Sequence, residues 1–199
     1  AYDLIDGRSL DALDDHEITD DLMRATWEQI AVLRSHRVAH RDLRRANVFV
    51  AADGSPWMID FGFSELAASD ALLRADVAQM LSSFAVVAGA ERSVRCAVDV
   101  LGTDAVGAAL PRLQPMALSG ATQSALKAHK GLLGEIQAQV VEQCGVAEIA
   151  YEQLNRVSGK TLFTLAMLAA VTYFLLPQFA DLPQIIDQVR DANWWLLPA

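Results

Sequence analysis

Three acidic or amide side chains lie at spacings that suit phosphoryl transfer. Asp42 lies five residues before Asn47, and Asp60 lies thirteen residues after Asn47. Phosphoryl transfer asks a protein mainly to hold a metal and the phosphates in place and to orient an acceptor hydroxyl for in-line attack. The Asp42 carboxylate could accept the hydroxyl proton. The neutral oxygen of Asn47 and the anionic oxygen of Asp60 are the hard ligands that Mg²⁺ prefers.

The residues between Asn47 and Asp60 are predicted to bring these oxygens together. Two β-prone runs, residues 48–50 and 57–59, flank the pair Asp53-Gly54. This pattern is typical of a β-hairpin with a tight turn. Because a strand out and a strand back return the chain to its starting point, we expect Asp60 to lie close to Asn47.

The same residues resemble the catalytic motifs of the protein-kinase-like superfamily. Residues 40–47, His-Arg-Asp-Leu-Arg-Arg-Ala-Asn, are similar to the kinase catalytic loop, and residues 60–62, Asp-Phe-Gly, are similar to its metal-binding motif. The resemblance implies ATP and Mg²⁺ as cofactors. It further implies that Asp42 is the catalytic base, and that Asn47 and Asp60 bind the metal and, through it, the nucleotide.

Four further residues gain supporting roles through this resemblance. It implies that His40 packs under the loop and that Arg41 braces it. Arg44 stands where many protein kinases have a lysine that holds the γ-phosphate. Asp76 resembles the buried acid that anchors the catalytic loop from below. For Asp76 the alternative is a capped or solvated helix acid.

Departures from the protein-kinase pattern narrow the resemblance, which covers about residues 1–150. Only sixteen residues separate Asp60 from Asp76, and no Ala-Pro-Glu lies between them. This leaves no room for the long segment on which a protein substrate docks. The arrangement is more similar to aminoglycoside or choline kinase-like enzymes and to bacterial lipopolysaccharide kinase-like proteins.

The chain contains no glycine-rich loop and no strand lysine paired with a helix glutamate. Residues 2–7 resemble the hinge between the two kinase lobes. We therefore expect the small lobe to lie upstream, and we expect this chain alone to be inactive.

The predicted fold class is α+β, a mostly helical kinase-like lobe with a short catalytic hairpin. A short extended run with a turn at residues 6–7 opens the chain. Thr19 is predicted to cap a helix that leaves Arg34 in solvent. Residues 71–88 are apolar nearly all round, which predicts a helix in the middle of the domain. Further helices are predicted at Glu91–Leu101, Thr122–Gln143 and Ala147–Val157, with breaks at Gly102, Pro111, Pro115 and Gly145.

A possible membrane span follows this domain. Residues 161–180 carry no formal charge, and a helix of that length covers about 30 Å, the thickness of a bilayer's hydrocarbon core. The alternative is a second buried helix of the globular domain. Arg156 and Lys160 precede the segment and Asp181 follows it, which places the upstream domain on the cytoplasmic side of the inner membrane.

The predicted organisation is therefore a kinase-like lobe at residues 1–150 and a juxtamembrane linker at 151–160. A transmembrane helix at 161–180 and an extracytoplasmic or interfacial segment at 181–199 follow. In the last segment, Trp194-Trp195 is typical of an interfacial anchor that opens another span. The tail resembles the entry into the multi-span lysylphosphatidylglycerol-synthase or flippase-like membrane domain of bacteria, so further spans are expected downstream.

Composition limits the partners. The net charge is −9, and without a basic stripe to release counterions the chain is not expected to bind nucleic acid. Cys96 and Cys144 lack metal or redox spacing and are expected to be reduced thiols.

Two functions remain open from the sequence. The first is a membrane-anchored kinase that transfers phosphate from ATP to a small-molecule or lipid hydroxyl, with Asp42 as base. The second is a pseudokinase that binds nucleotide and regulates an attached lipid-synthase or flippase-like membrane domain. A third, a plain membrane-anchored helical protein, leaves the coincident motifs unexplained.

Overall fold

The computed structural model of the chain describes residues 6–146 and 159–180, and within the last helix it describes the side chains of residues 163–173. The chain divides into two compact units, Ala1–Gln153 and Leu154–Ala199. The described part of the first unit is mostly helical with one small antiparallel sheet, which confirms the α+β class. The described part of the second unit is a helix.

The sheet contains the predicted hairpin and one additional strand. Val48 pairs with Met58 across the hairpin, whose turn contains Gly54 at φ +85°. The predicted turn at residues 6–7 is wrong at Gly7, which lies in a strand and pairs with Ala51. A Cβ at Gly7 would overlap the neighbouring backbone, so the close approach of the two strands requires glycine. The strands, in the spatial order β1-β2-β3, are β1 (Gly7–Ser9), β2 (Val48–Ala51) and β3 (Pro56–Met58).

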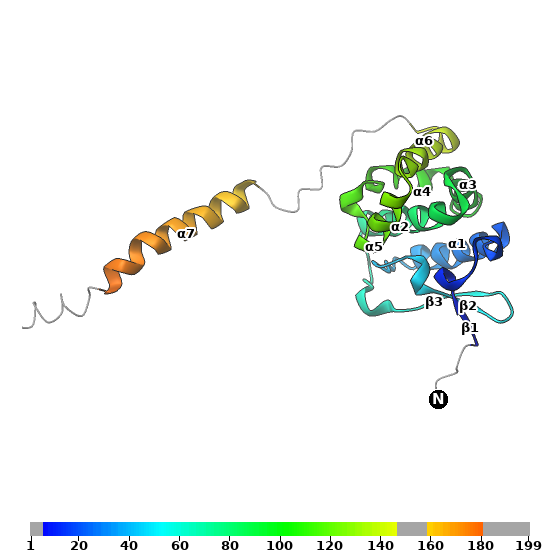
Figure 1. Ribbon diagram of the computed structural model, residues 1–199, viewed down its shortest axis with the longest axis horizontal. Helices are drawn as coiled ribbons and strands as arrows, with labels where there is room; N and C mark the ends of the chain where they lie inside the picture. Colours follow the sequence, from blue (N-terminus) through cyan, green and yellow to red (C-terminus); the bar gives the residue numbers. More distant parts are fainter. Residues whose placement is uncertain (1–5, 147–158, 181–199) are drawn as a thin grey trace, which may run out of the picture. The chain divides into compact units, whose positions relative to one another are not determined.

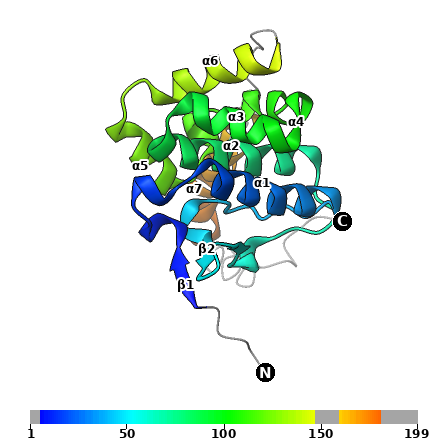
Figure 2. The same cartoon turned by 90° about the vertical axis from the view of Figure 1, so that its right-hand side faces the viewer.

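The helices of the first unit stack in layers away from the sheet (Figures 1 and 2). The first helix packs against β3 on one side and the third helix on the other, and the third helix also packs against the second and sixth. Short 3-10 turns connect these elements. The helices are α1 (Asp20–Ser35), α2 (Asp70–Ala88), α3 (Ala90–Leu101), α4 (Thr103–Gly107), α5 (Gly120–Ala128) and α6 (Leu132–Cys144).

Helix α1 begins as predicted, but one of its basic residues is not in solvent. The Thr19 hydroxyl accepts a hydrogen bond from the Leu22 N–H at 3.2 Å, so Thr19 is the N-cap. Arg34, predicted to be solvated, is half-buried, and its Nη1 donates to the Leu73 carbonyl oxygen at 3.1 Å. This burial lowers the pKa of the Arg34 guanidinium. The long stem of arginine lets a charged residue lie against an apolar neighbour while its head finds an acceptor.

Helix α2 is the centre of the core, as predicted. Phe84 is fully buried there and its ring lies 6.2 Å from that of Trp27 on α1. Cys96 of α3 is buried nearby as a free thiol. Among the described residues α2 is the one helix long and apolar enough to cross a bilayer, yet most of it is buried in the first unit. Burial on all sides gives the same all-round apolar pattern as a membrane span.

The predicted helix Thr122–Gln143 is wrong, because two helices occupy this range. Helix α5 ends at Ala128 and α6 begins at Leu132. Gly131 between them has φ +91°, a conformation that interrupts a right-handed helix and favours glycine. The break lets Leu126 and Leu132 both point into the core.

The four helix breaks predicted from the sequence are confirmed. Gly102 and Gly145 end α3 and α6 with positive φ, and Pro111 and Pro115 each lie in a 3-10 turn. The hinge residues 2–5, the predicted helix at 147–157, most of the linker at 151–160 and the segment 181–199 lie outside the described residues.

The second unit contains α7 (Gly159–Ala180), so the predicted helix at 161–180 forms. Its described side chains, residues 163–173, are all exposed and uncharged. They include Phe163, Leu165 and Tyr173. The placement of this helix in a membrane stays a prediction.

One carboxylate links α1 to α3. Asp20, in the first turn of α1, accepts hydrogen bonds from Arg92 Nε and from Arg95 Nη2, the latter at 2.9 Å. The bond from Arg92 is the main reason that the pKa of Asp20 lies below its ordinary value. The neighbouring Asp21 is almost fully exposed and contacts only Arg24 of its own helix, at 3.4 Å.

We predict that Asp20→Asn lowers the free energy of unfolding by about 1 kcal/mol at neutral pH, because it removes charged hydrogen bonds between two helices at a partly exposed site. Asp21→Asn is the matched control, since it removes the same charge from the same helix end, and it should change stability much less. Both are measured by urea unfolding.

The pH dependence follows from the lowered pKa. The stabilisation by Asp20 is complete above its ordinary pKa of 3.8 and is lost as the pH falls through the lower value of the folded protein. The difference between wild type and Asp20→Asn should therefore disappear in acid. Equal effects of Asp20→Asn and Asp21→Asn would contradict a role for the link to α3.

Candidate functional site

One buried side chain of α2 holds the backbone at the start of the segment 40–47. Asp76 Oδ2 accepts a hydrogen bond from the His40 N–H at 2.6 Å, and its Oδ1 accepts one from the Arg41 N–H at 2.8 Å. Arg41 has φ +67°, a strained conformation for a residue other than glycine. Burial raises the pKa of Asp76, and the two N–H donors oppose that effect. The two hydrogen bonds to the Asp76 carboxylate therefore offset the energetic cost of the strained Arg41 backbone.

His40 connects the loop to the end of the hairpin. It is fully buried, and its Nε2 lies 2.8 Å from the Ile59 carbonyl oxygen. Its ring centroid lies 4.8 Å from that of Phe61. Because a carbonyl can only accept, Nε2 carries the proton, and the buried Nδ1 has no hydrogen-bond partner among the described residues.

Arg41 and the chain after Asp60 are also connected. Arg41 Nη1 lies 3.3 Å from Glu65 Oε2. The backbones of Ala39 and Glu65 exchange two hydrogen bonds, of 2.8 and 3.0 Å. Glu65 was not among the residues predicted for the site, because no local spacing relates it to a loop more than twenty residues earlier.

Asp42, Arg44 and Asn47 form one hydrogen-bonded cluster. Arg44 holds the Asp42 carboxylate with two nitrogens, Nε at 3.0 Å from Oδ1 and Nη2 at 3.0 Å from Oδ2. Asn47 is buried, and its Nδ2 donates to Oδ2 of Asp42 at 2.9 Å and to the Asp42 carbonyl oxygen at 2.8 Å. These bonds occupy the amide nitrogen of Asn47 and leave its amide oxygen available as a ligand.

The hairpin brings Asp60 next to this cluster. The Ile59 N–H donates to the Asn47 carbonyl oxygen at 3.0 Å, which extends the β2–β3 pairing to the residue before Asp60. Asp60 is exposed and has φ +62°. The Asp60 carboxylate lies beside Gly62, because a Cβ built at Gly62 would be 3.4 Å from Asp60 Oδ1.

The ligands available suit a metal that keeps most of its own water. Within residues 6–146 and 159–180, no group of three or more His, Cys, Asp or Glu side chains could hold a metal ion. The site instead presents one exposed carboxylate, from Asp60, and one amide oxygen, from Asn47. Mg²⁺ binds in this way, through one or two protein oxygens together with water and phosphate. The types of oxygen donor present are therefore those that the ion implied by the resemblance accepts.

Two small hollows flank the loop. One, of about 140 Å³, is lined by Arg44, Arg45 and Thr122, among others, and the other, of about 210 Å³, is lined in part by Arg41 and Asp76. Burial lowers the pKa of the Arg45 guanidinium. Spaces of this size admit a small polar group rather than a folded protein chain.

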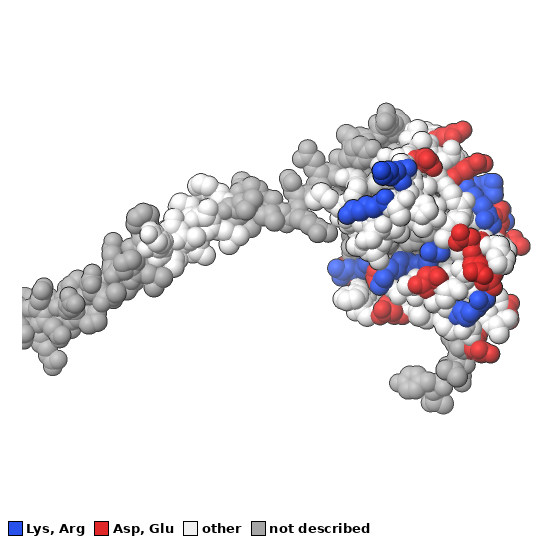
Figure 3. Space-filling model, in the orientation of Figure 1, with Lys and Arg blue, Asp and Glu red and all other residues white. Residues whose placement is uncertain are grey.

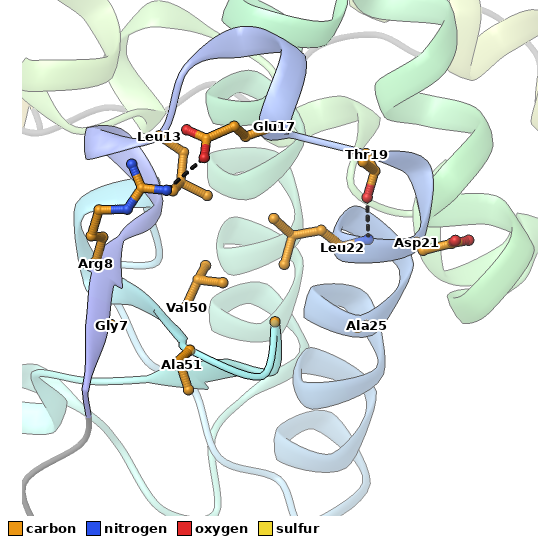
Figure 4. Close-up of a pocket in the computed structure, with 12 residues that line it drawn as sticks. Gly7, Arg8, Leu13, Glu17, Thr19, Asp21, Leu22, Ala25, Val50 and Ala51 are labelled. Atoms are coloured by element: carbon orange, nitrogen blue, oxygen red, sulfur yellow. Dashed lines mark hydrogen bonds and ion pairs between the residues drawn. The ribbon is translucent and has the colours of Figure 1, made fainter.

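A third hollow lies apart from these residues. It measures about 510 Å³ and lies between β1, the hairpin and the first turns of α1, with Leu13, Leu22 and Val50 around it and the Arg8–Glu17 ion pair at its edge (Figure 4). None of the predicted site residues lines it. Its lining comes from three separate segments, so no local pattern in the sequence indicates it.

The face of the first unit seen in Figure 3 carries charges of both signs. Acidic and basic side chains are interspersed over the visible surface of the first unit (Figure 3).

Comparisons with known proteins identify no family. No protein-family model matches the chain, and no curated protein matches it. What the chain does must therefore be inferred from its residues and their geometry.

We predict that Asp76→Asn lowers the free energy of unfolding by about 2 kcal/mol, because an amide has one oxygen for two buried N–H donors and turns its own NH₂ group toward the other. Chemical denaturation measures the loss. Hydrogen exchange should accelerate at the amides of His40 and Arg41. Asp70→Asn, at the exposed start of the same helix, is the control: it removes an exposed ion pair with Arg37, so it should lower stability much less and leave exchange at both amides unchanged. Unchanged exchange at both amides in Asp76→Asn would contradict this account.

Proposed function

We propose that this chain is the large lobe of a membrane-anchored, atypical kinase-like enzyme that transfers phosphate from ATP to a hydroxyl of a small molecule or lipid. The observation that carries the proposal is the Asp42–Arg44–Asn47 cluster with Asp60 returned beside it by the hairpin. The cluster and the hairpin that follows it thus supply a candidate base and two candidate oxygen ligands for a metal. Phosphoryl transfer depends on such positioning.

Each residue of the cluster has one group left for a reactant. Asp42 Oδ1 accepts from Arg44 Nε alone, so it is the oxygen better placed to receive a hydroxyl proton. The amide oxygen of Asn47 and the carboxylate of Asp60 would hold Mg²⁺, which supplies positive charge for the phosphates. Arg44 donates hydrogen bonds from Nε and Nη2 to Asp42, so its Nη1 is the nitrogen proposed to bind a phosphate oxygen.

The shape of the site supports a small acceptor. Only residues 61–69 separate Asp60 from the start of α2, and the hollows beside Arg44 and Arg41 are small. Neither feature offers an extended surface for a protein substrate.

Helix α7 supports membrane anchoring. Its described side chains are uncharged, mostly apolar and exposed, and backbone groups inside a bilayer are satisfied in a helix. With Arg156 and Lys160 before it, the proposed orientation leaves the first unit on the cytoplasmic side of the inner membrane. A small lobe upstream and further spans downstream belong to the same proposal.

One observation favours the alternative function, a nucleotide-binding pseudokinase that regulates an attached lipid-synthase or flippase-like membrane domain. Arg44 holds Asp42 with two nitrogens. A carboxylate held in this way is less free to take a proton. The two functions therefore differ in whether Arg44 assists transfer or blocks Asp42.

We predict that Asp60→Ala weakens binding of Mg·ATP to the full-length protein at least about tenfold, which corresponds to about 1.4 kcal/mol, because it removes the charged metal ligand. A thermal-shift titration with ATP measures the affinity with Mg²⁺ and with a chelator. Asp104→Asn, an exposed acid on α4, is the control and should bind as wild type. If Asp60→Ala kept the full Mg²⁺ dependence, Asp60 would not be a ligand.

A pair of variants separates the two functions. For an active enzyme, Asp42→Asn should reduce turnover by about 10² to 10⁴ while Mg·ATP binding is kept, because the variant lacks the base but keeps the shape. Arg44→Ala should also reduce turnover if Arg44 contacts the phosphate. Turnover that rises in Arg44→Ala would favour the pseudokinase held inactive by Arg44. Unchanged transfer in Asp42→Asn would remove Asp42 from the base role.

A further inference from the structure

An exposed apolar segment lies directly after Asp60. In this segment, residues 61–66, Phe61, Phe63 and Leu66 are 41%, 68% and 78% exposed. A single exposed apolar side chain is ordinary, but three within six residues are not scattered and mark a surface that meets something apolar.

The segment is ordered without help from the side chains of Phe63 and Leu66. Ser64 N–H donates to the Phe61 carbonyl oxygen at 3.0 Å, and Glu65 forms its two-bond bridge with Ala39. At its end the Ala68 N–H donates to the Arg37 carbonyl oxygen at 2.8 Å, and the Ala68 side chain is fully buried. The backbone is therefore held in place while the apolar side chains of residues 63 and 66 remain in solvent.

The segment is also fixed to the candidate site. The Phe61 ring contacts buried His40, and Glu65 pairs with Arg41, the residue before Asp42. Whatever covers the segment consequently lies next to the loop that carries Asp42.

We propose that residues 61–66 insert into the surface of a lipid bilayer and thereby place the candidate site at the headgroup layer. This proposal rests on the membrane anchoring by α7 and not on the phosphotransfer chemistry.

A bilayer is the occupant that the chain itself makes available. The described middle of α7 has no charged side chain (Figure 3). Between Val146 and Gly159 a chain extends at most about 45 Å. An inserted α7 would thus keep the first unit within reach of the membrane surface.

The charges around the segment indicate an apolar rather than an electrostatic contact. Arg41 is paired with Glu65, and Arg37 is paired with Asp70. Neither arginine adds an unbalanced positive charge that would attract anionic headgroups. The contact should therefore occur on zwitterionic lipid as well as on anionic lipid.

The test uses the full chain carrying Cys144→Ser, with single spin-labelled cysteines, reconstituted into phosphatidylcholine vesicles with or without phosphatidylglycerol. Phe63→Cys and Leu66→Cys report on the segment. Met167→Cys reports on α7, and Val32→Cys, at an exposed apolar position of α1, is the control. Collision rates with oxygen and with a water-soluble nickel chelate measure contact with lipid and with water. Matched thermal unfolding shows that each labelled protein is folded.

Labels at positions 63 and 66 should collide severalfold less with the nickel chelate, and more with oxygen, than the label at position 32, in both lipid mixtures. This proposal is overturned if the labels at positions 63 and 66 collide with the nickel chelate as often as the label at position 32 does, while the label at position 167 lies in lipid. That result would leave the anchoring by α7 intact. Frequent collision of the label at position 167 with the nickel chelate would overturn the anchoring and this proposal together. If the labels at positions 63 and 66 are shielded from both oxygen and the nickel chelate, the segment contacts a protein partner instead. If the labels enter lipid only when phosphatidylglycerol is present, the contact is not apolar.

Discussion

The buried carboxylate of Asp76 holds two successive backbone N–H groups, and the geometry of the candidate site depends on that contact. A loop with a left-handed Arg41 does not keep its conformation unaided, because that conformation is strained for a residue with a side chain. Asp76 is carried by α2, the helix at the centre of the core. The rigidity of the packed core is therefore transmitted to the loop through two hydrogen bonds, at 2.6 and 2.8 Å.

From this fixed loop the remaining site residues follow in order. His40 joins it to the end of the hairpin, and the hairpin returns Asp60 beside Asn47. The contact between Arg44 and Asp42 is different in kind, since both side chains are only partly buried and the guanidinium could move to a phosphate. The site thus combines a loop held by Asp76 with the partly exposed Arg44–Asp42 ion pair. At the site, the proposed enzyme and the proposed pseudokinase differ in whether Arg44 releases Asp42.

Two parts of the chain present apolar side chains that their own unit does not cover. Residues 61–66 do so from an ordered backbone beside the site, and α7 does so along its described length. Water solvates both poorly. A bilayer would cover them together, which links the proposed anchoring of the chain to the place where its chemistry is proposed to occur.

The sequence by itself determined the features that depend on neighbouring residues. The two β-prone runs around Asp53-Gly54 predicted the hairpin, Thr19 predicted the start of α1, and the all-round apolar run predicted the central helix, because each is governed by local backbone and packing preferences. Tertiary structure alone decided the burial of Arg34 against α2, the strand position of Gly7 and the contact of Glu65 with the loop. Each of these joins segments far apart in the chain, and only folding brings them together.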